Sequence, residues 1–398
     1  TSKKYIINFL NLSTNTYKKI IIATFDSFIY ALGDNNSSGI NKFKNMALSI
    51  IDQELKCGRN DTLKYGGSKL NLNKRMLFIG DEMQDLDIEY SKAMIKICIE
   101  RHCDFYTVGD ELQSISLENN AFTYLKKLET NNDIFLIFEK EKNDCRRIKQ
   151  QNLIDFVNNM VPFEEFNLLP ISGVALDSID IESCNKFQLL ATSKTDNCES
   201  QNFQSNLKTI MDLYIKEATI NNREAKDFLI ITPFTSTNPL CDALVTDIRK
   251  FWRNKDINDQ YIKHCIFHKS ETGTSIDLSA SDNATRIVSI HSSKGDGRPV
   301  VFVIGVTEKT LKCFCNDTNI IDTKPNIIYE SLLHVAVTRM KHKLYFGYVA
   351  NNDDIHRRMS ETNNDIIPCL SLKNNYECSK LVKSNIEKTF QTCKKLII

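Results

Sequence analysis

The sequence predicts an α/β protein built on parallel sheets, and two observations support that fold class. First, an apolar segment at 75–80 is followed by apolar residues at helical spacing and by a second apolar segment at 104–108. Strand, helix and strand in this order form a βαβ unit. The helical positions are Tyr90, Met94, Ile97 and Cys98. Second, short apolar runs recur at 228–231, 286–290, 300–304 and 344–349. In such sheets, ligands bind at the carboxyl ends of the strands.

Length and composition restrict the class of protein. A chain of 398 residues is too long for one hydrophobic core, so we expect two domains. With 51 basic and 50 acidic residues, the net charge is +1, so any nucleic-acid-binding groove is local. The thirteen cysteines contain no CxxC pair, which favours reduced thiols in an intracellular protein over a zinc site or a disulfide scaffold. No apolar run reaches the ~20 residues that span a bilayer, so we expect a soluble protein with no membrane partner.

Two acidic segments follow the strands of the predicted βαβ unit, and they are the first candidate site. After the first strand, Asp81 can hold Mg²⁺ through water, and Glu82 can orient or deprotonate an attacking water. After the second strand, Asp110 and Gln113 would lie at the same edge of the sheet, where Gln113 can reach a γ-phosphate. An acidic pair alone is more often a solvated strand end. The second acidic segment, expected at the same edge of the sheet, favours the functional interpretation instead. The segments are MLFIGDEMQD (76–85) and FYTVGDELQS (105–114).

A polar, glycine-containing loop separates the runs at 286–290 and 300–304. Its sequence is HSSKGDGRP (291–299). Such loops let backbone amides approach an anion, and Lys294 and Arg298 add positive charge. The alternative is a surface hairpin. If the loop is considered without the other motifs, the hairpin is the favoured interpretation.

Three arginines are candidates for stabilising the charge of a phosphate. Arg146 and Arg147 precede an amphipathic helix, and Arg339 is placed late in a second helical stretch, LLHVAVTRMKHK. An arginine that reaches a γ-phosphate from a second domain couples hydrolysis to domain closure. Each arginine taken singly is more often a salt-bridged surface residue.

Hydroxyl and aromatic side chains alternate after the apolar run 20–23. Thr24 and Ser27 can bind phosphates, while Phe25 and Phe28 can stack on bases, as in single-strand channels. Packing of both phenylalanines in the core is an equally good interpretation.

Six segments together resemble the motifs of superfamily 1 helicases of the UvrD/Rep/PcrA type. In order they are ATFDSF (23–28), DEMQD (81–85), VGDELQSI (108–115), DCRR (144–147), VSIHSSKG (288–295) and LLHVAVTRMKHKL (332–344). They resemble that family's TFHSF, DExxQD, GDxxQSIY, NYRS, TIHxxKG and LLYVAxTRAxxxL motifs. The compact arrangement is similar to helicase-like proteins of large DNA viruses, which would place the protein in the nucleus or in a cytoplasmic viral factory.

The resemblance implies a helicase or translocase that uses ATP and Mg²⁺ and moves 3′→5′ on single-stranded DNA in replication, repair or recombination. RNA is not excluded, because phosphate contacts do not report the sugar. The implied catalytic residues are the general base Glu82, the γ-phosphate contact Gln113 and the arginine sensors Arg146 and Arg339. Asp81 is the implied magnesium ligand, and the further nucleotide contacts are Asp110, Lys294, Gly295 and Asp296. The implied DNA contacts are Thr24, Phe25, Ser27, His291 and Ser292.

The same resemblance implies the domain organisation. A first RecA-like domain would span 1–129 with an insertion at about 33–74, and a second would span 130–350 with a reduced insertion at about 253–285. The polar tail 351–398 receives no assignment. Polar stretches at 33–41, 56–74 and 268–285 are interpreted as loops.

Departures from the family motifs favour an alternative. No GxxxxGK[ST] phosphate loop occurs, and residues 1–3 resemble a motif that follows it, so the chain is expected to begin downstream of its P-loop and to hydrolyse ATP poorly by itself. Cys145 replaces an adenine-stacking Tyr, and Gly297 replaces a Glu. The alternative is a catalytically inactive helicase-like protein that binds nucleic acid or a replication or repair partner.

Overall fold

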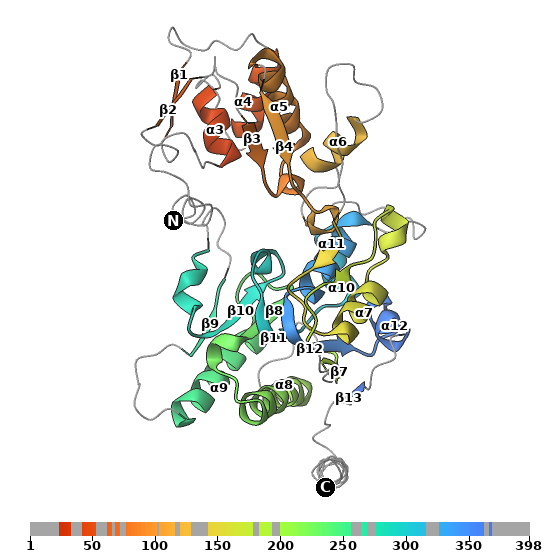
Figure 1. The fold of residues 1–398 in the computed structure, drawn as a ribbon. Coiled ribbons are helices and arrows are strands. Elements are labelled where there is room, and N and C mark those ends of the chain that lie inside the picture. The colour runs from red at the N-terminus through yellow and green to blue at the C-terminus, as the bar shows by residue number, and fades with distance from the viewer. Residues whose placement is uncertain are drawn as a thin grey trace. The chain divides into compact units, whose positions relative to one another are not determined.

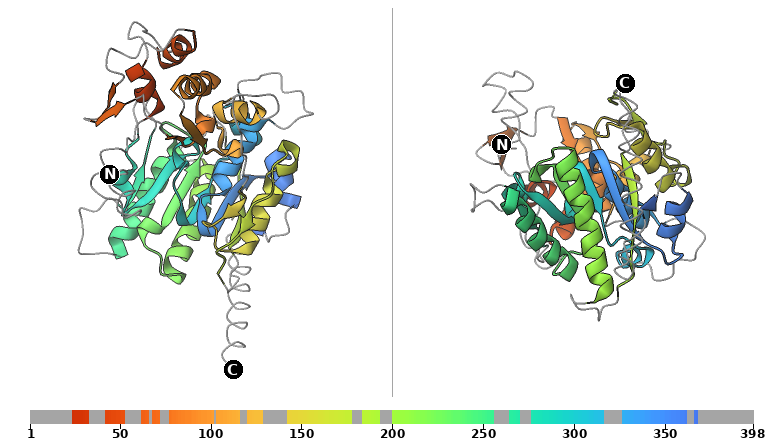
Figure 2. Two further views of the ribbon diagram at one scale, coloured as in Figure 1. Left: turned by 45° about the horizontal axis from the view of Figure 1, so that its top comes forward. Right: turned by 90° about the horizontal axis from the view of Figure 1, so that it is seen from below.

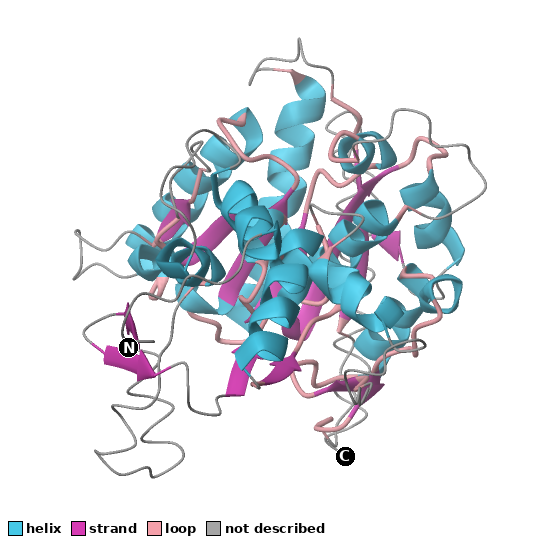
Figure 3. Ribbon diagram, turned by 90° about the horizontal axis from the view of Figure 1, so that it is seen from above, coloured by secondary structure: helices cyan, strands magenta, loops and turns pink. Residues whose placement is uncertain are grey.

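The computed structural model divides into two compact units, 1–141 and 142–398, and each is described by itself (Figure 1). Figure 3 shows the remaining, undescribed segments in grey. The described residues are 24–32, 42–52, 62–65, 68–71, 77–101, 103–115, 120–128, 142–177, 183–192, 200–255, 264–269, 276–315, 326–361 and 366–367. The predicted domain boundary at 129/130, the run 20–23, the stretch 33–41 and most of the tail lie outside these ranges.

The first unit contains the predicted βαβ unit. Strand β3 (Leu77–Gly80) is followed by α5 (Ile88–Arg101) and by β4 (Asp104–Thr107). The two strands pair in parallel from Leu77 opposite Asp104 to Gly80 opposite Thr107. Short 3₁₀ turns follow each strand, η1 (Met83–Asp85) after β3 and η2 (Glu111–Gln113) after β4. The remaining described elements are α3 (Phe25–Leu32), α4 (Lys42–Asp52), β1 (Thr62–Tyr65), β2 (Ser68–Asn71) and α6 (Ala121–Lys127).

One face of this small sheet packs on helices. The apolar side of α5 buries Tyr90, Met94 and Ile97 against residues of α3 and α4. Phe28 of α3 meets Phe78 of β3 edge-on, with ring centroids 5.3 Å apart. The predicted loop at 56–74 is partly wrong, because it contains β1 and β2, which form an antiparallel hairpin.

The second unit is a parallel sheet in the order β13-β7-β12-β11-β8-β10-β9. Every adjacent pair in it is parallel. The strands are β7 (Cys184–Leu189), β8 (Phe228–Thr232), β9 (Cys265–Phe267), β10 (Thr285–Ser289), β11 (Arg298–Val303), β12 (Met340–Val349) and the two-residue β13 (Ile366–Ile367). The interpretation of 286–304 as a surface hairpin is wrong, because β10 and β11 are parallel and β8 lies between them.

Helices cover both faces of this sheet. Helices α8 (Gln201–Ile220) and α9 (Pro239–Lys255) lie on one side, and α7 (Gln151–Met160) and α12 (Asp354–Glu361) lie on the other (Figure 2). The other described helices and turns are η4 (Phe163–Phe166), η5 (Ala225–Asp227), η6 (Leu278–Ser281), η7 (His291–Ser293), α10 (Glu308–Lys312) and α11 (Ile327–Val337). A short ladder joins β5 (Asp144–Cys145) to β6 (Ser172–Gly173). The arrangement is a helix–sheet–helix α/β fold, in agreement with the predicted fold class.

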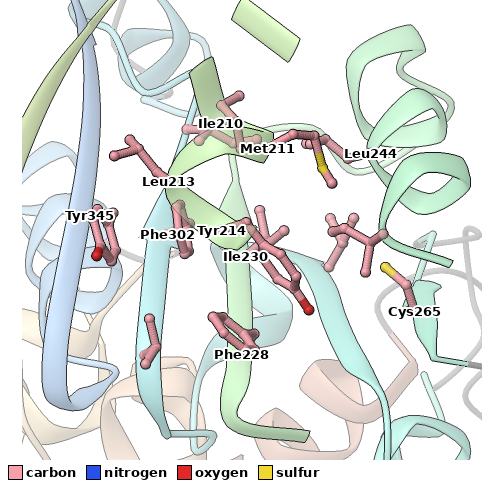
Figure 4. Close-up of a cluster of buried hydrophobic side chains, with 14 of the residues drawn as sticks. Ile210, Met211, Leu213, Tyr214, Phe228, Ile230, Leu244, Cys265, Phe302 and Tyr345 are labelled. Carbon is pink, nitrogen blue, oxygen red and sulfur yellow. The ribbon is translucent and has the colours of Figure 1, made fainter. Parts of the chain in front are cut away.

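The core of the second unit lies between the sheet and α8 and α9 (Figure 4). Tyr214 of α8 is fully buried among the rings of Phe228 and Phe302, and Tyr345 stacks on Phe302 at 4.5 Å. The Tyr214 hydroxyl accepts a hydrogen bond from Trp252 Nε1 at 2.8 Å and lies 2.6 Å from Thr285 Oγ1. The buried phenol is therefore fully hydrogen-bonded, as buried polar groups require.

Part of the unassigned tail belongs to the second unit. Helix α12 packs against α7 and β12. Its Arg358 makes a two-pronged ion pair with buried Glu330 of α11, at 2.6 and 2.7 Å, and donates to the Met160 carbonyl. Within the described ranges, no helix is long and apolar enough to cross a membrane.

Candidate functional site

The two acidic segments of the first unit meet at one edge of the β3–β4 sheet. Asp81 follows β3 directly, and Asp110 lies three residues after β4. Two backbone hydrogen bonds join the strand ends, from Val108 N to Gly80 O at 2.8 Å and from Met83 N to Val108 O at 3.2 Å. The predicted placement of both segments at one sheet edge is confirmed. This edge is the candidate site of the first unit.

Asp81 and Glu82 are both exposed at this edge. Asp81 Oδ1 accepts a hydrogen bond from the Glu82 backbone N–H at 3.0 Å. Glu82 has φ 54° and ψ 40°, the left-handed conformation that residues other than glycine rarely adopt. This conformation costs about 1–2 kcal/mol, and such strain is concentrated at functional sites.

Gln84 was not identified from the sequence, although it joins the two segments. Its side chain is fully buried. Nε2 donates to Glu82 Oε2 at 2.6 Å, and Oε1 accepts from the Asp110 backbone N–H at 3.0 Å. Its place as the glutamine of the DEMQD segment is the one signal in the sequence that singles it out, whereas its partners depend on the pairing of β3 with β4.

Asp110 and Gln113 form the second half of the edge. Asp110 caps the η2 turn, since its Oδ1 accepts from Leu112 N at 3.0 Å. Its Oδ2 accepts from Gln113 Nε2 at 2.8 Å. The Gln113 amide is thereby held beside the carboxylate of Asp110, within a turn that also contains Glu111.

Asp81 is the residue of this edge that could hold a magnesium ion. Mg²⁺ keeps several waters and takes one or two carboxylates plus phosphate oxygens. Asp81 is exposed, and the described part of the chain gives its Oδ2 atom no partner. No group of three or more His, Cys, Asp or Glu residues that could hold a metal by itself occurs among the described residues. A single protein carboxylate with water and phosphate is therefore the coordination this edge could supply.

The predicted DNA contacts of the first unit lie at the start of α3. Thr24 is exposed and caps the helix, because its Oγ1 accepts from Ser27 N at 3.2 Å and donates to Ser27 Oγ at 2.9 Å. Phe28 is buried in the core, so for this residue the packing interpretation is right. Phe25 is partly buried against the same core. Its contact with DNA, and those of Thr24 and Ser27, stay predictions.

In the second unit, the segment after β10 begins with the η7 turn. Ser292 is held by Ser289, whose Oγ accepts from Ser292 N at 3.2 Å and lies 2.9 Å from Ser292 Oγ. The His291 ring packs against Phe314 with centroids 4.8 Å apart. His291 and Ser292 therefore lie at the carboxyl end of β10, and both are half-buried.

The rest of this loop returns to the amino end of β11. Lys294 is half-buried, and Gly295 is exposed with φ +79°. Asp296 Oδ2 accepts from Arg286 Nη1 at 2.6 Å, and the Arg286 side chain is only 6% exposed. The carboxylate of Asp296 thus has a buried cation as its partner.

Arg298 does not add charge to the loop, contrary to the expectation from the sequence. Its guanidinium is buried and donates to the backbone carbonyls of Phe228, Ala284 and Ser281. Burial, together with the neighbouring Arg286 guanidinium, lowers the pKa of Arg298 to about 10, so the side chain stays charged at neutral pH. The reason for the error is that Arg298 begins a central strand, where its side chain can reach only carbonyls at the amino ends of the strands.

The three candidate arginines of the second unit have different surroundings. Arg146 is exposed after β5. Arg147 is half-buried, and its Nη1 donates to the Thr338 carbonyl at 3.1 Å. Arg339 is 1% exposed, and its guanidinium donates to Val335 O at 3.0 Å and Thr338 Oγ1 at 2.8 Å. The predicted helix over 332–343 is partly wrong, because α11 ends at Val337 and Arg339 immediately precedes β12.

The predicted residues of the second unit are thus divided between the two ends of its sheet. His291 and Ser292 follow β10, whereas Gly297 directly precedes β11 and Arg339 directly precedes β12. A Cβ atom on Gly297 would lie 3.0 Å from Arg339 O and 3.1 Å from Arg147 Cδ. Gly297 and Arg339 therefore lie at the amino ends of β11 and β12, whereas the two acidic segments of the first unit follow the carboxyl ends of their strands.

Comparisons with known proteins leave the family open. No protein-family model matches the chain, and no curated protein matches it in sequence. Among solved structures, one similar chain is the C-terminal domain of a possible DNA helicase from Lactobacillus plantarum WCFS1. That match has a TM-score of 0.32 and 12% identity, and it covers 57% of this chain and 100% of that domain. Similarity at this level supports no conclusion about family or activity.

Proposed function

We propose that this protein is an ATP-dependent motor, a helicase or translocase, that moves 3′→5′ on single-stranded DNA. In this proposal the two units are RecA-like domains, and ATP and Mg²⁺ are the cofactors. The proposal rests on the order of the six motif-like segments and on the geometry of one site.

One observation supports the proposal most strongly. The predicted magnesium ligand Asp81, base Glu82 and γ-phosphate contact Gln113 come from two segments that gather at one edge of a parallel strand pair. Phosphoryl transfer requires a metal-holding carboxylate, a group that orients water and a polar contact to the γ-phosphate within one small volume. A scaffold protein would need none of these groups together.

Each residue has a proposed task. Asp81 would hold Mg²⁺ with water and phosphate oxygens, and Glu82 would orient and deprotonate the attacking water. Gln113 would contact the γ-phosphate. Arg146 and Arg339 would stabilise transition-state charge, with Asp110, Lys294, Gly295 and Asp296 as further nucleotide contacts. Thr24, Phe25, Ser27, His291 and Ser292 would contact the strand.

A second candidate function is a helicase-like protein that binds nucleic acid without hydrolysing ATP. The loop of residues 294–297 favours it. Gly297 carries no carboxylate, and the carboxylate of neighbouring Asp296 is already paired with Arg286. A loop without an available acidic side chain would contribute less to nucleotide binding.

A strand-displacement assay separates the two functions. The full-length gene product, including any sequence before Thr1, is mixed with a DNA duplex that carries a 3′ or a 5′ single-stranded tail. The motor proposal expects ATP-dependent displacement from the 3′-tailed substrate and loss of displacement in Glu82→Gln, with DNA binding retained. Binding to both substrates with neither displacement nor ATP hydrolysis, in the presence of ATP and Mg²⁺, would favour the non-catalytic function.

A further inference from the structure

We propose that Gln84 is a positioning residue that holds the Glu82 carboxylate and ties it to the segment 109–113. This inference rests on the proposed function, in which Glu82 acts as the base. The side-chain hydrogen bonds of Gln84 go to Glu82 and to Asp110. It acts through its two hydrogen-bond partners.

The direction of the Gln84 amide follows from its partners. The Asp110 backbone N–H is a donor, so the atom that faces it at 3.0 Å must be the acceptor Oε1. The other end of the amide is then Nε2, which can only donate, and it lies 2.6 Å from Glu82 Oε2. The bonding pattern therefore requires Glu82 Oε2 to be an acceptor, as a carboxylate base is.

The surroundings of Gln84 give the link little freedom. The side chain is fully buried, and its backbone carbonyl accepts a hydrogen bond from the buried Ser114 hydroxyl at 3.4 Å. A Cβ atom on Gly109 would lie 2.9 Å from Gln84 Oε1, so glycine at 109 lets the strand end approach the amide. Buried hydrogen bonds of this kind fix the position of the groups they join.

The link connects the proposed base to the proposed γ-phosphate contact. Asp110 binds the Gln84 amide with its backbone N–H and binds the Gln113 amide with its carboxylate. Glu82, Gln84, Asp110 and Gln113 thus form one continuous chain of hydrogen bonds across two strand ends. A shift of the Asp110 backbone would move the Glu82 carboxylate through Gln84.

Two substitutions test the link separately from folding. Gln84→Met keeps the length of the side chain and removes both hydrogen bonds. Gln84→Glu keeps an acceptor for Asp110 N–H and places a second carboxylate against Glu82. A matched control is Asn206→Leu in the second unit, because Asn206 is also buried and also makes two side-chain hydrogen bonds, both with Leu190 at 2.8 Å.

Steady-state ATP hydrolysis and hydrogen exchange are measured on the full-length protein with single-stranded DNA. We expect kcat to fall about 100-fold in both Gln84 variants, because misplacing a catalytic group by about 1 Å has an effect of that size. The KM for ATP should stay within about threefold of the wild-type value.

Hydrogen exchange at the Asp110 amide should accelerate in Gln84→Met and stay slow in Gln84→Glu. On the Glu82→Gln background, Gln84→Met should change the residual rate less than about twofold, because coupled residues are not additive. Asn206→Leu should keep kcat.

The outcomes separate this inference from the proposed function. An active protein that Glu82→Gln inactivates, but whose kcat survives Gln84→Met, would overturn the inference and leave the proposed function standing. A protein without ATP hydrolysis would contradict the proposed function. In that case, unchanged exchange at the Asp110 amide in Gln84→Met would also overturn the link, and faster exchange would support it.

Discussion

Arg147 and Thr338 lie 191 residues apart in the chain and are joined by a hydrogen bond of 3.1 Å from Arg147 Nη1 to the Thr338 carbonyl. Gly297 lies beside this bond, close to both Arg147 and the carbonyl of Arg339. Three segments that the sequence presents separately therefore meet at the amino ends of β11 and β12.

This junction predicts that Gly297→Ala destabilises the second unit. The added Cβ would lie at 3.0–3.1 Å from Arg339 O and from the Arg147 side chain, and overpacking of this kind lowers the free energy of unfolding by about 1–3 kcal/mol. Gly295→Asn is the control, because Gly295 has open space around it and asparagine tolerates its φ of +79°. Urea unfolding measures both variants, and equal midpoints for Gly297→Ala and the wild type would contradict the packing described for this junction.

Phe28 is predicted to stabilise the first unit rather than to bind DNA. Phe28→Ala should lower the free energy of unfolding by about 3–5 kcal/mol, because the ring is 8% exposed and packs on Phe78. Phe25→Ala should cost less, since Phe25 is only partly buried. Thermal unfolding followed by circular dichroism measures the difference. A Phe28→Ala protein as stable as the wild type would show that the ring is not part of the core.

The ion pair between Arg358 and Glu330 predicts that α12 is required for the stability of the second unit. Arg358→Ala should cost about 3–5 kcal/mol, because it leaves the Glu330 carboxylate buried without its partner. Replacing both residues with leucine should recover much of that loss. Arg357→Ala is the matched control, since the Arg357 side chain is 68% exposed and pairs with Asp354 at the surface. Urea unfolding that gives the same loss for Arg357→Ala and Arg358→Ala would contradict this account.

His268 predicts a pH dependence of stability. Burial, and then the Arg286 and Arg298 guanidinium groups, lower the pKa of His268 below its usual value of 6.5. The folded protein therefore binds a proton less readily than the unfolded chain. The stabilisation that comes from neutral His268 is fully present above pH 6.5. It is lost as the pH falls from 6.5 through the lower pKa that His268 has in the folded protein.

A His268→Gln variant tests this dependence. The difference in unfolding free energy between wild type and variant should favour the wild type more at pH 7.5 than at pH 5, and urea unfolding at both values measures it. A difference that grows on acidification would reverse the sign and contradict the assignment of neutral His268, which lies 2.7 Å from Ser281 Oγ.

The sequence was informative where continuous apolar runs coincide with buried strands. Strands β8, β10 and β11 were predicted because each buries successive residues, as strands of a covered parallel sheet do. Strands β3 and β4 were predicted from their apolar runs, although Leu77, Ile79 and Tyr106 are exposed. Strand β12 was only partly predicted. Helix α11 ends at Val337, and Met340 pairs with Arg298 of β11, a contact that the local spacing of apolar residues does not encode. The hairpin of β1 and β2 was missed because its residues are polar.

In the candidate site too, residues marked by local sequence were predicted, and residues defined by distant partners were missed. Asp81 and Asp110 were found because acidic residues follow apolar runs. Gln84 and Arg147 were missed as linking residues, because their partners are distant segments that only the folded sheet brings close. The burial of Arg298 was missed for the same reason, since its three carbonyl partners come from separate parts of the second unit.

The rate of ATP hydrolysis with and without single-stranded DNA, compared between the wild type and Glu82→Gln, tests the central claim most directly. The full-length protein is assayed with Mg²⁺, and Glu100→Gln on α5 is the control, because Glu100 is an exposed residue whose carboxylate pairs, within the described part of the chain, with Lys96. We predict DNA-stimulated turnover in the wild type and in Glu100→Gln, and a loss of at least about 100-fold in Glu82→Gln. Equal turnover in Glu82→Gln and the wild type, or no turnover in any of the three proteins, would contradict the claim that the β3–β4 edge is a site of ATP hydrolysis.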